Sequence, residues 1–181
     1  SDTLVAAQRL VSLISENGDM GKALSILKNE MVGSYCFTFI SDDNSVYAAR
    51  DPKGFRPMVL GHKKSDDTYI VTSESAAITA VGATLQRDVV PGELIKLSKT
   101  GLETELFSTD SSRAHCSFEF TYFAHPSSNM EGHNIYVSRK KIGQFMAKKF
   151  PIKDADLVIP VPDSARPAAL GYAQELGVSF D

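Results

Sequence analysis

The chain opens with hydrophobic residues at helical spacing. Ser1-Asp2-Thr3 has the composition of a helix cap, and Asn17-Gly18 is typical of a helix end. Between them, hydrophobic residues recur at positions that share one helical face: Leu4, Val5, Leu10, Val11 and Ile14. A second helix is predicted to begin after Asp19, which can cap it, and to stop at Gly33.

From residue 34 the pattern changes to the alternation of a strand. Tyr35, Phe37 and Phe39 share one face, and Asp42-Asp43-Asn44 follows as a turn. Ser73-Glu74-Ser75 is predicted to cap a short helix that Gly82 ends. Further strands are predicted at residues 45–49, 58–61, 68–72, 85–89, 94–97 and 102–107. Residues 1–107 therefore predict two helices and a mostly antiparallel sheet with one short inserted helix.

The last third of the chain predicts a different arrangement. Polar residues 108–113 indicate a junction between domains, residues 116–123 alternate like a strand, and a helix is predicted from about Tyr136 to Phe150. Leu157–Val161 is an unbroken apolar run, typical of a strand covered on both faces in a parallel sheet. A polar loop and an alanine-rich helix ending at Gly177 follow. The fold class is α/β, in the broader sense of α+β.

This strand, loop and helix form the strongest candidate site. Such a unit places backbone N–H groups and a helix N-terminus at the carboxyl edge of a sheet, where phosphates bind. Ser164 offers a hydroxyl for a phosphate or a hydrated Mg²⁺, and Arg166 offers a guanidinium for an anion. Many βα units have a similar loop and hold no ligand, so the residues alone leave both interpretations open.

Charge and composition exclude several classes of protein. The net charge of −3 and the lack of a basic run argue against nucleic acid as a partner. No apolar stretch reaches the ~20 residues of a membrane span. Two cysteines, Cys36 and Cys116, make no disulfide framework and favour the reducing cytoplasm. The four histidines show no metal-ligand spacing. The chain does not begin with Met, and it ends four residues after Gly177, which is expected to close a helix. We therefore expect it to be a piece of a longer polypeptide.

Three further motifs have structural explanations that we favour. Ser1 could be an N-terminal nucleophile, but its place in a helix cap argues against this. Arg50, Asp51 and Arg56, in the turn RDPKGFRP, are expected to pin that turn rather than to form a site. Cys116 alone is expected to be a small apolar residue.

Several stretches together resemble the glutamine phosphoribosylpyrophosphate amidotransferase family. They are SDT at the start, AARDPKGFRPMVLG, SES, RDVVPGELI, CSFEFTYFAHPSS and VIPVPDSARPAALGYA. The resemblance implies an N-terminal-nucleophile (αββα) glutaminase domain, with its C-terminal part at residues 1–112. It also implies the start of a type I phosphoribosyltransferase (Rossmann-like) domain at residues 113–181. Members of the family convert phosphoribosylpyrophosphate and glutamine to 5-phosphoribosylamine, the first step of purine synthesis.

The resemblance also assigns three residues. It implies that Asp2 holds the α-ammonium group of glutamine and that Ser164 binds Mg²⁺ with phosphoribosylpyrophosphate. Cys116 matches the first of four cysteines that hold a [4Fe–4S] cluster in some members. No catalytic residue is assigned, because the family's nucleophilic Cys and the acidic loop that binds the ribose are absent from this chain. The isolated piece is therefore expected to be inactive. Members of the family commonly form homodimers or tetramers, so the resemblance implies a homo-oligomer.

Two other interpretations remain open from the sequence. RDPKGFRP, SES and DVVPGE also resemble other class-II glutamine amidotransferases, such as asparagine synthetase. The asparagine synthetase family carries an S-G-G-x-D-S phosphate loop in its second domain, where this chain has VPDSARPAALGYA. A non-catalytic relative that keeps the scaffold is the second alternative.

Overall fold

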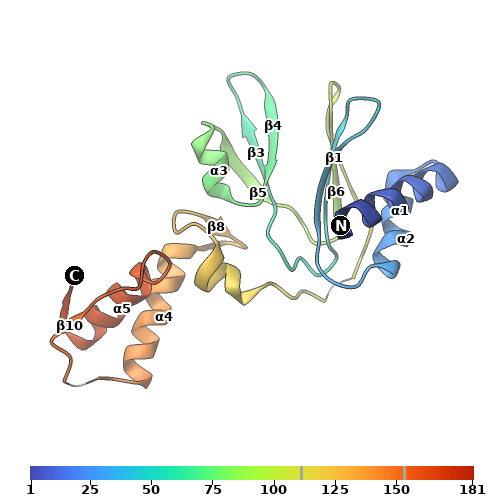
Figure 1. Ribbon diagram of the computed structural model, residues 1–181. Coiled ribbons are helices and arrows are strands. Elements are labelled where there is room, and N and C mark those ends of the chain that lie inside the picture. The colour runs from blue at the N-terminus through green and yellow to red at the C-terminus, as the bar shows by residue number, and fades with distance from the viewer. Residues whose placement is uncertain (111, 153) are drawn as a thin grey trace. The chain divides into compact units, whose positions relative to one another are not determined.

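The computed structural model describes residues 1–110, 112–152 and 154–181, which form two compact units (Figure 1). Unit 1 consists of Ser1–Ser73 and Gln86–His115, and unit 2 of Glu74–Leu85 and Cys116–Asp181. The short inserted segment 74–85 thus belongs with the C-terminal part of the chain. Ser111, in the predicted junction, lies outside the described residues.

Unit 1 begins with the two predicted helices, α1 (Asp2–Asn17) and α2 (Met20–Glu30). The Ser1 hydroxyl caps α1 by accepting the Leu4 N–H at 3.4 Å, and Gly18 ends the helix in the left-handed conformation at φ 66°. Asp19 caps α2 by accepting the Lys22 N–H at 2.7 Å. Both helices are confirmed, although α2 ends before the predicted stop at Gly33.

Two sheets follow the helices in unit 1. The first is antiparallel in the order β1-β2-β6-β7, formed by β1 (Cys36–Ile40), β2 (Val46–Arg50), β6 (Glu93–Ser98) and β7 (Gly101–Leu106). The second has the order β4-β3-β5, formed by β3 (Val59–Lys63), β4 (Thr68–Thr72) and β5 (Thr84–Asp88). The chain returns from unit 2 to unit 1 within β5. The mostly antiparallel prediction is confirmed.

The first sheet is covered on both faces. Ala49 and Leu94 pack with Leu13, Leu24 and Leu27 of the two helices. Their chain neighbours Ala48 and Ile95 point to the opposite face and pack with buried residues from other strands and loops, namely Met58, Leu60 and Val89. Successive strand residues face opposite sides, so one strand serves both cores.

Unit 2 is built from short strands and helices. They are α3 (Ser75–Ala80), the π-helix η1 (Glu119–Phe123), β8 (Asn129–Met130), β9 (His133–Asn134), α4 (Ile135–Lys149), β10 (Leu157–Val158), α5 (Arg166–Leu176) and β11 (Ser179–Phe180). The predicted long helix matches α4 to within one residue at each end.

The strand predicted over residues 116–123 is wrong, because this segment forms η1. Its aromatic residues fit the two-residue period of a strand and also the spacing of a helix. Phe118 and Tyr122 are four positions apart, which places them on one side of a helical turn, and both are exposed, at 59% and 62%. Phe120 packs instead against Ala124 and Met130. Local alternation alone therefore could not separate the strand from a helical turn.

Helices α4 and α5 lie side by side (Figure 1), with their backbones in contact at two glycines. A Cβ atom at Gly143 would lie 1.8 Å from the Ala168 carbonyl oxygen. A Cβ atom at Gly171 would lie 2.1 Å from the Lys140 carbonyl oxygen. Only glycine permits this approach at either position.

The predicted strand–loop–helix unit is present, and α5 joins two parallel strands. Leu157 pairs with Ser179, and Val158 pairs with Phe180. The expectation that the run Leu157–Val161 is covered on both faces is wrong for the described residues. Leu157, Ile159 and Val161 are 49%, 68% and 78% exposed, because the sheet here contains only these two strands.

Candidate functional site

The loop that leads into α5 has the geometry of an anion site. Residues 162–165 form a turn, and the helix begins at Arg166 with Pro167 in its first turn. Ala165 occupies the N-cap position, so no side chain caps the helix. The N–H groups of a helix N-terminus carry partial positive charge and attract anions. Ser164 lies in this turn before the helix, as the sequence predicted, and it is half-buried.

Two charged residues flank Ser164. The Arg166 guanidinium lies 3.1 Å from the Asp163 carboxylate, and both side chains are exposed. An exposed ion pair of this kind is weak and can open to bind a ligand. The Ser164 hydroxyl and the Asp163 carboxylate offer the oxygen ligands that Mg²⁺ prefers. No group of three His, Cys, Asp or Glu side chains in the described ranges is placed to hold a metal. A magnesium ion at this loop would therefore need ligands from a bound phosphate and from water.

Asp2 lies in unit 1, in the first turn of α1. Its exposed carboxylate accepts the Thr3 N–H at 2.8 Å. Within the predicted cap Ser1-Asp2-Thr3, the capping residue is Ser1, and Asp2 is the first residue of the helix. The Asp2 carboxylate is therefore left at the surface, where it can meet a cationic group.

Cys116 lies in unit 2 and is half-buried with a free thiol. Its carbonyl oxygen accepts the Glu119 N–H at 3.2 Å, just before η1. The only other cysteine, Cys36, belongs to unit 1. A [4Fe–4S] cluster requires four thiolates. The two cysteines of this chain do not fit that requirement by themselves.

The turn RDPKGFRP is held by buried charges, as predicted. The Arg50 guanidinium donates to the carbonyl oxygens of Val89, Arg56 and Gly54 at 2.6, 2.9 and 3.0 Å. The buried Asp51 carboxylate accepts backbone N–H groups of the same turn, and burial raises the pKa of Asp51. These contacts are directed at the backbone, so the motif builds the fold.

The SES motif has a role that the sequence did not reveal. Glu74 occupies the N-cap position of α3, but its side chain does not cap the helix. Its carboxylate instead accepts the His125 N–H at 2.7 Å and the Ser128 hydroxyl at 2.8 Å. The Ser128 oxygen in turn accepts the Ala76 N–H at 3.3 Å, so a residue from another segment caps α3.

A second bond joins the same two segments, from the Asn129 N–H to the Ser75 hydroxyl at 2.7 Å. We call Glu74, Ser75, His125, Ser128 and Asn129 the cap-exchange network. The sequence shows SES and HPSSN as separate motifs, and only their proximity in the structure connects them.

Arg139 of α4 is the other buried charge of unit 2. Its guanidinium donates to the carbonyl oxygens of Phe120 at 2.7 Å and Ala124 at 2.8 Å, which holds the end of η1. Burial lowers the pKa of Arg139, and the negative charge of Glu74 opposes this shift. An arginine among the lysines of a helix is usually expected at the solvated face, but Arg139 is only 2% exposed.

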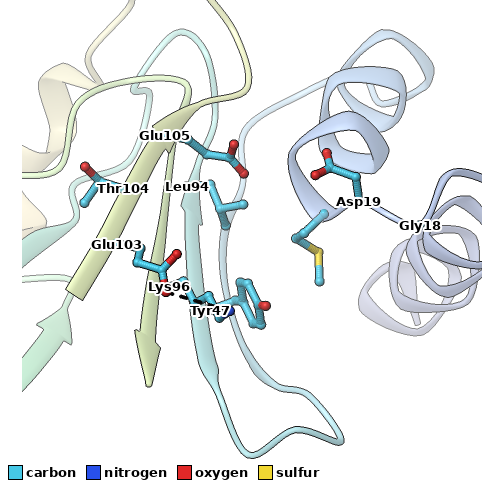
Figure 2. Close-up of a pocket in the computed structure, with 9 residues that line it drawn as sticks. Gly18, Asp19, Tyr47, Leu94, Lys96, Glu103, Thr104 and Glu105 are labelled. Atoms are coloured by element: carbon cyan, nitrogen blue, oxygen red, sulfur yellow. Dashed lines mark ion pairs between the residues drawn. The ribbon is translucent and has the colours of Figure 1, made fainter. Parts of the chain in front are cut away.

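Unit 1 contains several cavities, and the two described next are not lined by Asp2, Cys116 or Ser164. Figure 2 shows the first, of about 410 Å³, between the start of α2 and strands β2, β6 and β7. It is lined by the carboxylates of Asp19, Glu103 and Glu105 and by one ammonium group, that of Lys96, which lies 3.9 Å from Glu103. The second, of about 500 Å³, is mostly apolar and runs along α1 and the edge strand β1.

Comparison with known proteins identifies relatives along the whole chain. The amidophosphoribosyltransferase of Archaeoglobus fulgidus is 42% identical over 99% of this chain. That of Bacillus subtilis is 37% identical over 100%, and that of Mycobacterium tuberculosis 43% identical over 82%. The chain spans 38% of the length of the Archaeoglobus protein. No family model matches the chain.

Two solved structures have the same fold as this chain. The glutamine phosphoribosylpyrophosphate amidotransferase of B. subtilis, complexed with ADP and GMP, has a TM-score of 0.89 and 34% identity. It covers 100% of this chain, which in turn covers 38% of that structure. A structure described as the allosteric regulatory enzyme of purine biosynthesis has a TM-score of 0.86 and 35% identity over 95% of this chain. No helix among the described residues is long and apolar enough to cross a membrane.

Proposed function

Because the chain corresponds along its whole length to a segment of the amidophosphoribosyltransferases, we propose that it is part of an enzyme of this activity. The enzyme would convert phosphoribosylpyrophosphate to 5-phosphoribosylamine, with nitrogen from glutamine, at the first step of purine synthesis. The observation that carries this proposal is the TM-score of 0.89 to the B. subtilis glutamine phosphoribosylpyrophosphate amidotransferase over the whole chain.

In this proposal residues 1–112 are the C-terminal part of an N-terminal-nucleophile glutaminase domain, and residues 113–181 begin a type I phosphoribosyltransferase domain. The sheet of unit 1, packed on both faces, supports the first assignment. The parallel pair β10 and β11 joined by α5 supports the second. Residues 74–85 would be a glutaminase segment that is built into the transferase part.

The loop before α5 would bind the diphosphate of phosphoribosylpyrophosphate. The N–H groups at the start of α5 would receive its oxygens, and Arg166 would leave Asp163 to contact the anion. Ser164 and Asp163 would hold a hydrated Mg²⁺ against the same oxygens. When bound, the metal would neutralise negative charge on the pyrophosphate leaving group. Ammonia attacks C1 of the ribose with its lone pair, the C1–O bond to pyrophosphate breaks, and the amine then loses a proton.

Asp2 would bind the α-ammonium group of glutamine, which its exposed carboxylate at the surface of unit 1 supports. If the whole protein holds a [4Fe–4S] cluster, Cys116 would be one ligand and the others would come from outside this segment. We also propose a cytoplasmic location, consistent with two free thiols, and a homo-oligomer of the whole protein.

Glutamine-dependent release of pyrophosphate from phosphoribosylpyrophosphate tests this proposal. The 181-residue chain alone is expected to give no rate above blank, because it lacks an N-terminal Cys. A hybrid in which the chain replaces its counterpart in the Archaeoglobus relative is expected to be active. In that hybrid, Ser164→Ala should raise the KM for phosphoribosylpyrophosphate, and Ser15→Ala on the surface of α1 should not. An active hybrid with an unchanged KM after Ser164→Ala would refute the assigned site.

A further inference from the structure

The cap-exchange network fixes the loop that precedes α4. The Glu74 carboxylate holds this loop at the His125 N–H and at the Ser128 hydroxyl. The loop then binds the start of α4 through two backbone bonds of 3.0 Å, from the Ile135 N–H to the Ser128 carbonyl oxygen and from the Tyr136 N–H to the Pro126 carbonyl oxygen. Glu74 is therefore connected through this loop to the first turn of α4, which Asn134 caps.

Helix α4 carries that position to α5. Gly143 of α4 is in backbone contact with Ala168, the third residue of α5. Packed backbones leave no flexible side chain between the two helices to absorb a displacement. Ser164 precedes the first residue of α5 by two positions. A shift at the start of α4 must therefore move the N-terminus of α5, or the contact at Gly143 must break.

We propose that Glu74 is a positioning residue for the Ser164 loop, acting through the 125–129 loop and through α4 on the first turn of α5. The whole connection lies within unit 2. Glu74 stands at the point where the chain passes from unit 1 to unit 2. The inference rests on the proposed function for the identity of the ligand at that loop.

Amide hydrogen exchange of the 181-residue chain tests the positioning role. Glu74→Gln keeps the size of the side chain and removes its charge, and Ser128→Ala removes the hydroxyl that the carboxylate accepts. Each is expected to speed exchange about tenfold at residues 125–129 and also at Arg166 and Ala169, whose N–H groups bond the carbonyl oxygens of Asp163 and Ala165 at 3.3 and 2.9 Å. Glu74→Gln weakens the bonds to His125 and Ser128 by removing the charge of their acceptor, and Ser128→Ala removes one of them. Because both variants weaken the same connection, the double variant should add less than the sum of the two single effects.

Glu16→Gln is the matched control, since the Glu16 carboxylate also accepts a serine hydroxyl, from Ser12 at 2.9 Å, but on the surface of α1. It should leave exchange in unit 2 unchanged. Faster exchange confined to residues 125–129 would overturn the proposal by showing a local role. Equal acceleration in α1 would overturn it by showing general destabilisation. If Glu74→Gln does not fold, Ser128→Ala decides the question.

A titration with Mg²⁺ and inorganic pyrophosphate separates this inference from the proposed function. Binding at the Ser164 loop is expected, with an affinity about tenfold weaker in Glu74→Gln. Binding of equal affinity in both proteins would overturn the positioning role. If the unmodified chain binds no pyrophosphate, the ligand assigned to the loop is wrong, and the exchange measurement still decides whether Glu74 positions it.

Discussion

Replacing Gly143 by alanine should destabilise unit 2, although the same change usually stabilises a helix. Alanine in a helix interior is favoured over glycine by about 1 kcal/mol. At this position, however, the new Cβ would lie 1.8 Å from the Ala168 carbonyl oxygen and 2.6 Å from its carbonyl carbon. An ordinary contact begins near 3.4 Å, so the backbones of α4 and α5 would have to separate by about 1.6 Å.

That separation also loosens the neighbouring contact at Gly171 and Lys140. Overpacking of an interior usually costs about 1–3 kcal/mol, and the upper end applies here because both groups belong to the backbone. After the gain in helix propensity, we expect Gly143→Ala to lower the free energy of unfolding of unit 2 by about 2 kcal/mol. Urea denaturation, followed by exchange of the α4 and α5 amides, measures the change.

Gly21→Ala is the matched control, because Gly21 also lies in a helix and close to a neighbour. There the nearest atom to the new Cβ would be the Glu105 Oε1 at 2.5 Å, the end of a flexible side chain that can turn away. Gly21→Ala should therefore leave stability unchanged or raise it slightly. If Gly143→Ala is as stable as the unmodified chain, the backbone contact between α4 and α5 is not as close as described, and the reasoning fails.

Three further changes test other buried groups. Tyr35→Phe should raise the free energy of unfolding by about 1 kcal/mol in urea denaturation, because the buried Tyr35 hydroxyl has no hydrogen-bond partner among the described residues. A loss of stability would show that the hydroxyl forms a hydrogen bond in the folded protein. Burial raises the pKa of Asp51 in the folded state, so ionisation of Asp51 opposes folding as the pH rises above the unfolded pKa of about 4. Asp51→Asn removes this ionisation and should therefore become more stable relative to the unmodified chain as the pH rises. Unfolding curves between pH 4 and 7 in which the free energies of unfolding of the two proteins differ by a constant amount would contradict this. Arg139→Lys should lower the free energy of unfolding by about 2 kcal/mol, since an ammonium cannot bond two diverging carbonyl groups in the manner of a guanidinium. The exposed Arg9→Lys, beside Glu30, is the comparison and should change stability by less than about 1 kcal/mol.

Elements with strong local signals were predictable from the sequence. The prediction for β4 agrees with the structure at both ends, and α4 agrees to within one residue, because turn residues and hydrophobic spacing define them locally. The loop with Ser164 and Arg166 was also placed correctly at the start of α5, by the sequence of apolar run, polar loop and alanine-rich helix. Its ligand stays a prediction.

The errors involve interactions between distant residues. The π-helical turn depends on Arg139, which lies 19 positions from the carbonyl group of Phe120 that it holds. Glu74 was expected to cap its own helix, but its partners lie 51 and 54 positions away. No local pattern distinguishes a carboxylate that caps a helix from one that holds another segment, so only the fold could reveal this part of the site.

The division of unit 2 between two stretches of sequence has a consequence for synthesis on the ribosome. Residues 74–85 leave the exit tunnel before the segment that they bind, and His125 lies 51 positions later. At about 5–20 residues per second this delay lasts about 3–10 seconds, long compared with helix formation. During that time the six-residue α3 lacks the Ser128 hydroxyl that caps it. We therefore expect the nascent chain to complete unit 1 only after β6 and β7 emerge, and to hold residues 74–85 as an unstructured loop until the C-terminal part arrives.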